Sequence, residues 1–162
     1  MQHASARPAD RIETVLQTYG NMLFRLSLVM LGSEKDAEDA VQETIMKYLQ
    51  KAPIFTDSEH EKAWLLKVAA NQCRDMLRFR LRHPQTDLEA LRETAAETAD
   101  SGILEALMRL PEKYKLVLIL YYVEEYRIEE IANLIGRSAS AVKMRLQKGR
   151  RLLEETYRKE YL

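Results

Sequence analysis

Basic side chains are concentrated in one short stretch of this chain, residues 131–153. The stretch contains six Lys or Arg residues and no acidic residue, so it carries a charge of +6 in a protein whose total formal charge is zero. The six residues are Arg137, Lys143, Arg145, Lys148, Arg150 and Arg151. A local field of this strength and sign favours a polyanionic partner such as nucleic acid.

Two amphipathic helices are predicted to position these cations. Apolar residues recur at helical spacing in two sets, Ile128, Ile131, Leu134 and Ile135, then Val142, Leu146, Gly149 and Leu153. Between them, Gly136 can adopt the left-handed conformation that ends a helix, and Ser138 can cap the first amides of the next one. The pattern is typical of a helix-turn-helix.

The second of these helices has the character of a DNA-recognition helix. Its first residues, 139–141, are small and would allow close approach to a groove. The side chains that project away from the core are Lys143, Met144, Gln147, Lys148 and Arg151. A basic amphipathic helix standing alone can also be a solvated face or a partner-binding helix, but the preceding turn favours docking in a DNA major groove.

A second set of four cations and one amide follows one face of the helix predicted to start near Ser58. We call this set the basic stripe; its members lie four, three, four and four residues apart and are Lys67, Asn71, Arg74, Arg78 and Arg82. A solubilising face would usually intersperse acids, and here only Asp75 and His83 interrupt the series. The stripe therefore predicts a second nucleic-acid surface.

The helix predicted before it has an acidic and amidic outer face. We call this the acidic face; its members are Asp39, Gln42, Glu43 and Met46. Such a face is either an ordinary solvated surface or a docking surface for a basic partner. Because Ile45 and Met46 lie beside the acids, docking is favoured.

Composition predicts an all-α protein. Hydrophobic residues make up 46% of the 162 residues, charged residues 31%, and glycine and proline are few. The single cysteine, Cys73, neighbours apolar helix positions and is interpreted as a structural thiol. No apolar signal segment opens the chain, and the run 116–123 is less than half of the roughly 20 residues that a membrane span needs. A cytoplasmic protein without direct membrane insertion is expected.

An enzyme has little support in the sequence. The three histidines are far apart, and no Gly-rich phosphate loop occurs. The neighbouring acids at 124–125 and 129–130 fit a helix surface. No catalytic residue, metal ligand, cofactor or small-molecule substrate is expected.

The chain is predicted to consist of two small helical domains joined by a flexible linker. The first spans residues 1–83, with a helix opened by Asp10 and ended by Gly32, a second opened by Ser33 and Asp36, and a third opened by Ser58 and Glu61. Residues 84–102 carry a charge of −4 and form the linker, which either competes with DNA for the basic surfaces or is simply solvated. The second domain spans residues 103–162 and carries the helix-turn-helix.

With these motifs in hand, the chain resembles a bacterial sigma factor of the extracytoplasmic-function group. GSEKDAEDAVQETIMKYLQ resembles the family helix that docks on the polymerase, and AWLLKVAANQCRDMLR resembles the helix that opens the minus-ten promoter element. LPEKYKLVLILYYVEEYRIEEIANLIGRSASAVKMRLQKGRRLL resembles the family's minus-thirty-five recognition domain. The resemblance covers nearly the whole chain and keeps the order of the three segments.

The resemblance implies roles for individual residues. The acidic face would contact core RNA polymerase, Asn71 would hold an unstacked promoter base, and the cations of the basic stripe would follow the minus-ten strand. The minus-thirty-five element would be contacted by a recognition surface made of Ser140, Lys143, Met144, Arg145, Gln147, Lys148 and Arg151. Two departures from the family lie at Tyr126-Arg127, where a cap is usual, and at Met144, where a small hydroxyl is common.

The resemblance also implies partners. These are core RNA polymerase, promoter DNA and an anti-sigma factor. The alternative is a stand-alone helix-turn-helix regulator, whose first domain would bind a ligand or dimerise. Binding to polymerase separates the two hypotheses.

Overall fold

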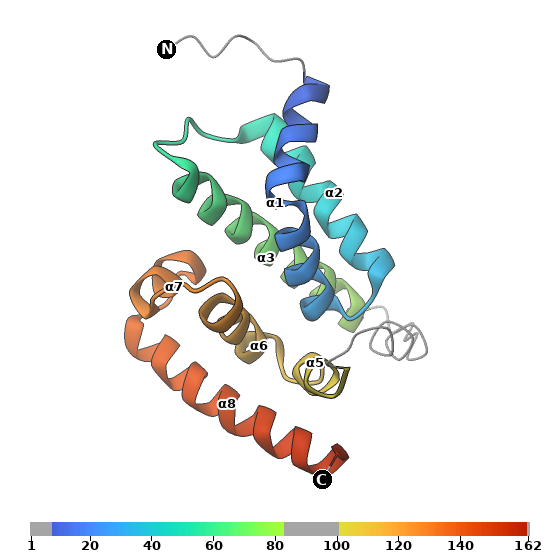
Figure 1. The fold of residues 1–162 in the computed structure, drawn as a ribbon, viewed down its shortest axis with the longest axis vertical. Coiled ribbons are helices and arrows are strands. Elements are labelled where there is room, and N and C mark those ends of the chain that lie inside the picture. Colours follow the sequence, from blue (N-terminus) through green and yellow to red (C-terminus); the bar gives the residue numbers. More distant parts are fainter. Residues whose placement is uncertain (1–7, 83–100, 162) are drawn as a thin grey trace.

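The computed structural model describes residues 8–82 and 101–161, and every regular element within these two ranges is helical (Figure 1). The prediction of an all-α chain with two helical domains is confirmed. The predicted linker lies almost wholly outside the described residues. The next helix begins at Ser101, so the last two residues of the predicted linker, 101 and 102, are helical.

The N-terminal domain is built from three helices that pack against one another, α1 (Pro8–Leu31), α2 (Glu34–Lys51) and α3 (Ser58–Arg82) (Figure 1). Gly32 has a φ of 71° after the last residue of α1, and the Ser33 hydroxyl accepts a hydrogen bond from the Asp36 N–H at 3.3 Å. Both boundaries were predicted. The core holds the leucines at 23, 26, 65 and 66.

Two local details of this domain differ from the prediction, namely the start of α1, which is Pro8 and not Asp10, and the cap of α3. The cap of α3 is Asp57, whose carboxylate accepts a hydrogen bond from the His60 N–H at 2.7 Å, and not Ser58. A charged carboxylate at this position also interacts favourably with the helix dipole, which the serine hydroxyl does not. Cys73 is fully buried, and burial raises the pKa of its thiol to about 11, as suits a structural cysteine.

The C-terminal domain follows with five helical elements. These are α5 (Ser101–Met108), α6 (Glu112–Leu118), the π-helical turn η1 (Ile119–Val123), α7 (Ile128–Ile135) and α8 (Ala139–Tyr161). Pro111 lies one position before α6 and supplies its first backbone acceptor to Tyr114 and Lys115. The π-helical turn was not predicted, because its residues have the same apolar character as α6.

The helix-turn-helix is formed by α7 and α8. Gly136 is left-handed, with a φ of 70°, and the Ser138 hydroxyl accepts a hydrogen bond from the Ala141 N–H at 3.1 Å. At the start of α7, the Glu130 carboxylate accepts from the Arg127 N–H at 3.0 Å. Glu130 thus caps α7 at Arg127, one of the two positions where the sequence departs from the family that it resembles.

The two domains pack directly against each other, with α1 against α5 and α6 and with α3 against α7. We call these contacts the interdomain interface (Figure 1). The Glu124 side chain is only 6% exposed there and forms ion pairs with Arg25 at 2.8 Å and Lys62 at 3.6 Å, both in the N-terminal domain. Buried apolar residues of the two domains form one cluster. The interface is therefore apolar in part and closed by ion pairs at its edge.

Candidate nucleic-acid interface

The predicted recognition surface lies on one side of α8. Ser140, Lys143, Gln147, Lys148 and Arg151 are exposed, as is Met144 with 70% of its surface. Arg145 is the exception, since it is half-buried. Val142 and Leu146 are buried on the opposite side, so packing of the apolar side against the domain presents the cations outward.

The structure adds Lys113 and Tyr114 of α6 to this surface. They line a shallow groove of about 570 Å³ together with residues of α8. The Tyr114 ring lies under two ammonium groups, with Lys113 Nζ 5.1 Å and Lys148 Nζ 5.6 Å from its centroid. A Cβ added at Gly149 would lie 3.4 Å from the Tyr114 Cβ, so this glycine allows α6 and α8 to approach closely. The sequence does not predict that Lys113 and Tyr114 join the recognition surface, because only helix packing brings α6 beside α8.

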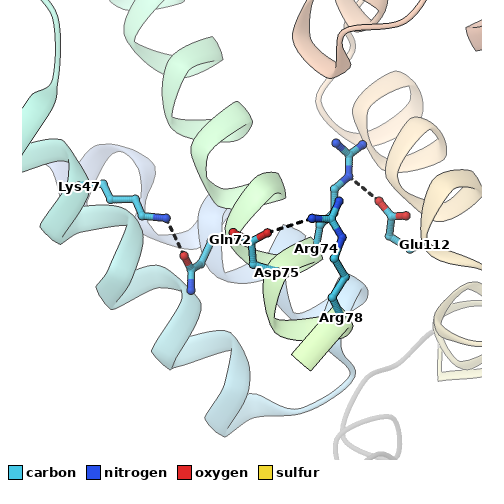
Figure 2. A network of polar contacts seen from close by, with 6 residues as sticks. All are labelled: Lys47, Gln72, Arg74, Asp75, Arg78 and Glu112. Atoms are coloured by element: carbon cyan, nitrogen blue, oxygen red, sulfur yellow. Dashed lines mark hydrogen bonds and ion pairs between the residues drawn. The ribbon is translucent and has the colours of Figure 1, made fainter. Parts of the chain in front are cut away.

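The basic stripe is assembled on α3, but its members differ in exposure. Lys67, Asn71 and Arg82 are exposed. Figure 2 shows Arg74 directed toward the C-terminal domain, where its Nε donates to a Glu112 carboxylate oxygen at 2.6 Å. Arg78 lies 3.4 Å from the Asp75 carboxylate, and both side chains remain mostly exposed. Arg74 is therefore partly neutralised by the other domain, whereas the rest of the stripe is open to an anion.

An aromatic cavity of about 370 Å³ lies beside Lys67. Trp64 and His60 form its wall in the N-terminal domain, and Tyr126 and Asn133 contribute the wall from the C-terminal domain. Trp64 also packs edge-to-face against Phe55, which holds the loop before α3. Aromatic rings beside cations are the surfaces on which unstacked bases bind. The sequence analysis did not single out Trp64 and so missed this part of the site.

The acidic face on α2 is open to solvent. Asp39, Gln42 and Glu43 are exposed, and Met46 exposes 48% of its surface. Within residues 8–82 and 101–161, neither Asp39 nor Glu43 forms an ion pair. Lys47, the next side chain along the helix, is turned aside by a 2.7 Å hydrogen bond to Gln72 (Figure 2). The face is thus uncompensated negative charge around an exposed methionine.

Cations of the basic stripe and of the recognition surface meet in a cleft between the two domains. This interdomain cleft has a volume of about 340 Å³ and is lined by Arg74, Leu77, Arg78, Leu81, Glu112, Lys113, Arg137 and Arg145. Burial, together with the neighbouring Arg137 and Arg74 guanidiniums, lowers the pKa of Arg145. Because an arginine stays charged, this shift reports first the cost of burying the guanidinium and then its repulsion by the neighbouring cations.

Neither a metal site nor a membrane-spanning helix is found in the described part of the chain. No group of His, Cys, Asp and Glu residues there is arranged to hold a metal ion. None of the described helices is long and apolar enough to cross a membrane.

Comparison with known families gives two matches along the chain. Residues 15–83 match the family model for Sigma-70 region 2, and residues 101–153 match the model for Sigma-70, region 4. The RNA polymerase sigma factor SigV of Bacillus subtilis is 29% identical over 153 residues, which cover 92% of each chain. The ECF RNA polymerase sigma factor SigW of the same organism is 25% identical over 170 residues, which cover 92% of this chain and 90% of SigW.

Solved structures share the fold. The sigma factor RpoE from Bartonella quintana, solved in complex with the anti-sigma factor NepR, superposes with a TM-score of 0.73 at 21% identity, over 93% of this chain and 98% of RpoE. CnrH, solved in complex with the cytosolic domain of CnrY, superposes with a TM-score of 0.65 at 22% identity, over 92% of this chain and 88% of CnrH.

Proposed function

We propose a division of labour among three surfaces of this chain, which belongs to the extracytoplasmic-function group of bacterial RNA polymerase sigma factors. It is an alternative sigma factor that directs RNA polymerase to promoters and initiates transcription there. The family consists of transcription initiation factors, and we infer that the chain has no catalytic activity of its own. We also infer that it works in the cytoplasm, where polymerase and promoters are found.

The acidic face is proposed to bind core RNA polymerase. Its support is the exposed, unpaired charge of Asp39 and Glu43 beside the exposed Met46. An interface needs an apolar centre for affinity and complementary charge for orientation and on-rate. A basic, partly apolar surface on the polymerase would supply both.

The two cationic surfaces are proposed to bind different forms of promoter DNA, and their different construction is the observation that carries this proposal. The recognition surface on α8 is an exposed helix face that suits the major groove of duplex DNA at the minus-thirty-five element. The basic stripe instead combines Asn71 with cations and the nearby Trp64 ring. Amides, rings and cations together suit an unstacked strand, as promoter opening at the minus-ten element requires.

The two domains are proposed to separate when the protein binds a promoter. The minus-ten and minus-thirty-five elements lie about 25 base pairs apart, which corresponds to roughly 85 Å of duplex. We call the arrangement seen in the structure, with the two domains packed together, the closed arrangement. In it Arg74 and Arg145 line one cleft of about 340 Å³, so the two surfaces are far too close to contact both promoter elements. We further propose an anti-sigma factor as a partner, in line with the complexes in which RpoE and CnrH were solved.

The assignment is tested by charge reversal on the acidic face. Asp39→Arg with Glu43→Arg should abolish binding to core polymerase and run-off transcription, because the docking charge becomes repulsive. Glu13→Arg with Glu155→Arg is the matched control, since it makes the same charge change at exposed positions on α1 and α8. Circular dichroism should show unchanged helicity in both.

Two outcomes would contradict the proposal. If the Asp39/Glu43 variant binds core polymerase as tightly as the control, the acidic face is not the docking surface. If the parent protein binds promoter duplex tightly without polymerase and starts no transcripts with it, the protein works as a stand-alone helix-turn-helix regulator.

A further inference from the structure

Among the described residues, the interdomain cleft holds more positive charge than its acidic side chains neutralise. Five cations line it, namely Arg74, Arg78, Lys113, Arg137 and Arg145, and Glu112 is the one acidic residue in the part of its lining that the structure describes. Asp75 approaches Arg78 from outside the cleft at 3.4 Å. Counting both carboxylates leaves a net charge of +3, and counting Glu112 alone leaves +4.

Both domains contribute to this excess. Arg74 and Arg78 come from α3, Arg145 comes from α8, and Arg137 comes from the turn between α7 and α8. Figure 2 shows how the Arg74–Glu112 pair spans the two domains next to Arg78. In the described part of the chain Arg137 and Arg145 have no ion-pair partner. Closing the domains therefore crowds cations that repel one another unless an anion joins them.

We propose that the interdomain cleft is a binding site for a small oligophosphate, an anion with two or three linked phosphate groups, which bridges the two domains in their closed arrangement. Guanidinium groups bind phosphate oxygens through paired hydrogen bonds, and the cleft offers four of them. Two linked phosphates carry a charge of about −3, which matches the excess positive charge of the cleft. A single phosphate would leave about half of that positive charge without a partner.

The size of the cleft also favours a small anion over a nucleic acid. Its volume of about 340 Å³ lies within the range of small-molecule sites, at roughly 300–1,000 Å³. A duplex cannot enter a space walled by two packed domains. The side chains of Leu77 and Leu81 form an apolar part of the wall, against which the ring of a nucleoside triphosphate could pack.

Binding would favour the closed arrangement, since the anion contacts both domains only when they are together. By mass action, the closed form gains stability in proportion to the logarithm of the anion concentration above its dissociation constant. The bound anion would also occupy Arg74 and Arg145, which are assigned to promoter DNA. This consequence for transcription rests on the proposed function, whereas binding of the anion does not.

The test is calorimetric titration of the full chain with inorganic tripolyphosphate at constant ionic strength. We expect one molecule to bind per chain, and Arg78→Gln and Arg145→Gln, one in each domain, to weaken binding at least tenfold. The matched control is Arg150→Gln, which removes an equal charge from α8 outside the cleft, where Arg150 donates to the Tyr122 hydroxyl at 2.8 Å. Its affinity should stay within twofold of the parent. Thermal unfolding without ligand verifies that each variant is folded.

Two further titrations identify the source of the phosphates and the class of ligand. A nucleoside triphosphate that binds at least threefold more tightly than tripolyphosphate indicates that a base packs on Leu77 and Leu81; equal affinities indicate that the phosphates alone are recognised. A twelve-nucleotide DNA strand that binds in an Arg78- and Arg145-dependent manner, while tripolyphosphate does not bind, would show that the cleft takes nucleic acid and would overturn the proposal.

Other results would also overturn it. Equal losses of tripolyphosphate affinity in Arg150→Gln and Arg145→Gln would show that the overall charge of the protein, and not the cleft, determines binding. Binding of several anions per chain, or no binding at millimolar tripolyphosphate, would exclude a built site. None of these results bears on the acidic face, so failure here leaves the polymerase assignment standing.

Discussion

Reversing the charge of Glu124 should open the two domains. In the closed arrangement its carboxylate lies between Arg25 at 2.8 Å and Lys62 at 3.6 Å, with only 6% of the side chain exposed. Arg25 and Lys62 are 49% and 26% exposed, so each pair is worth about 0.5 kcal/mol after solvent screening. Glu124→Lys replaces two attractions by two repulsions of similar size, which costs the closed form about 2 kcal/mol.

A cost of about 2 kcal/mol changes the ratio of closed to open molecules by roughly 30-fold. The assay is fluorescence energy transfer between dyes on cysteines introduced at the exposed positions 50 in α2 and 159 in α8. Cys73 will not compete for the dyes, because it is fully buried and its thiol pKa is raised to about 11. Transfer efficiency should fall in Glu124→Lys, and Arg25→Glu in the same chain should restore part of it.

The matched control for this prediction is Glu154→Lys. Glu154 pairs with Arg158 within α8, and both side chains are more than 60% exposed, so the variant makes the same charge change without touching the interdomain interface. Its transfer efficiency should equal that of the parent. The reasoning is refuted if Glu124→Lys keeps the parent's distance distribution, or if Glu154→Lys opens the protein equally.

Three further predictions concern single residues. Lys143→Ala should weaken specific duplex binding by about 1–3 kcal/mol and relax preference at one base position, whereas Arg151→Ala should weaken binding to all sequences alike. The measurement is a selection experiment on random duplexes. Identical base preferences of Lys143→Ala and the parent would remove Lys143 from the recognition surface. Asn71→Ala should lower permanganate reactivity of promoter thymines on a duplex template and recover on a pre-melted one, and an unchanged duplex signal would leave Asn71 without a role in opening. Burial and the nearby Arg80 lower the pKa of Lys115 from 10.5 to about 8. Between these two pH values the unfolded chain binds more protons than the folded one. The free energy of unfolding therefore rises with pH, by up to roughly 3 kcal/mol. Lys115→Met should lack this rise in urea titrations at pH 7.5 and 10, and an equal rise in variant and parent would contradict the assignment.

The sequence alone determined the α-helices of both domains and the caps at Ser33 and Ser138, although it missed the Asp57 cap and the π-helical turn. Apolar spacing located α7 and α8, and Gly136 and Ser138 fixed the turn between them, since these features depend on residues three or four positions apart. The same short-range rules placed Asp39 and Glu43 on an outward face. The domain roles and the contacts assigned to these surfaces remain predictions until the experiments above are made.

Only the tertiary structure decided how the surfaces relate to one another. Glu112 is 38 residues from the arginine it neutralises, Arg74, and Glu124 is 99 residues from Arg25. Helical periodicity carries no information over such separations, because these contacts follow from how complete helices pack. The exposed stripe expected on α3 thus became a stripe with one member held by the other domain, and the interdomain cleft could not be predicted. Residues that are close in the sequence specify each helix, whereas the contacts between helices depend on how the whole chain packs.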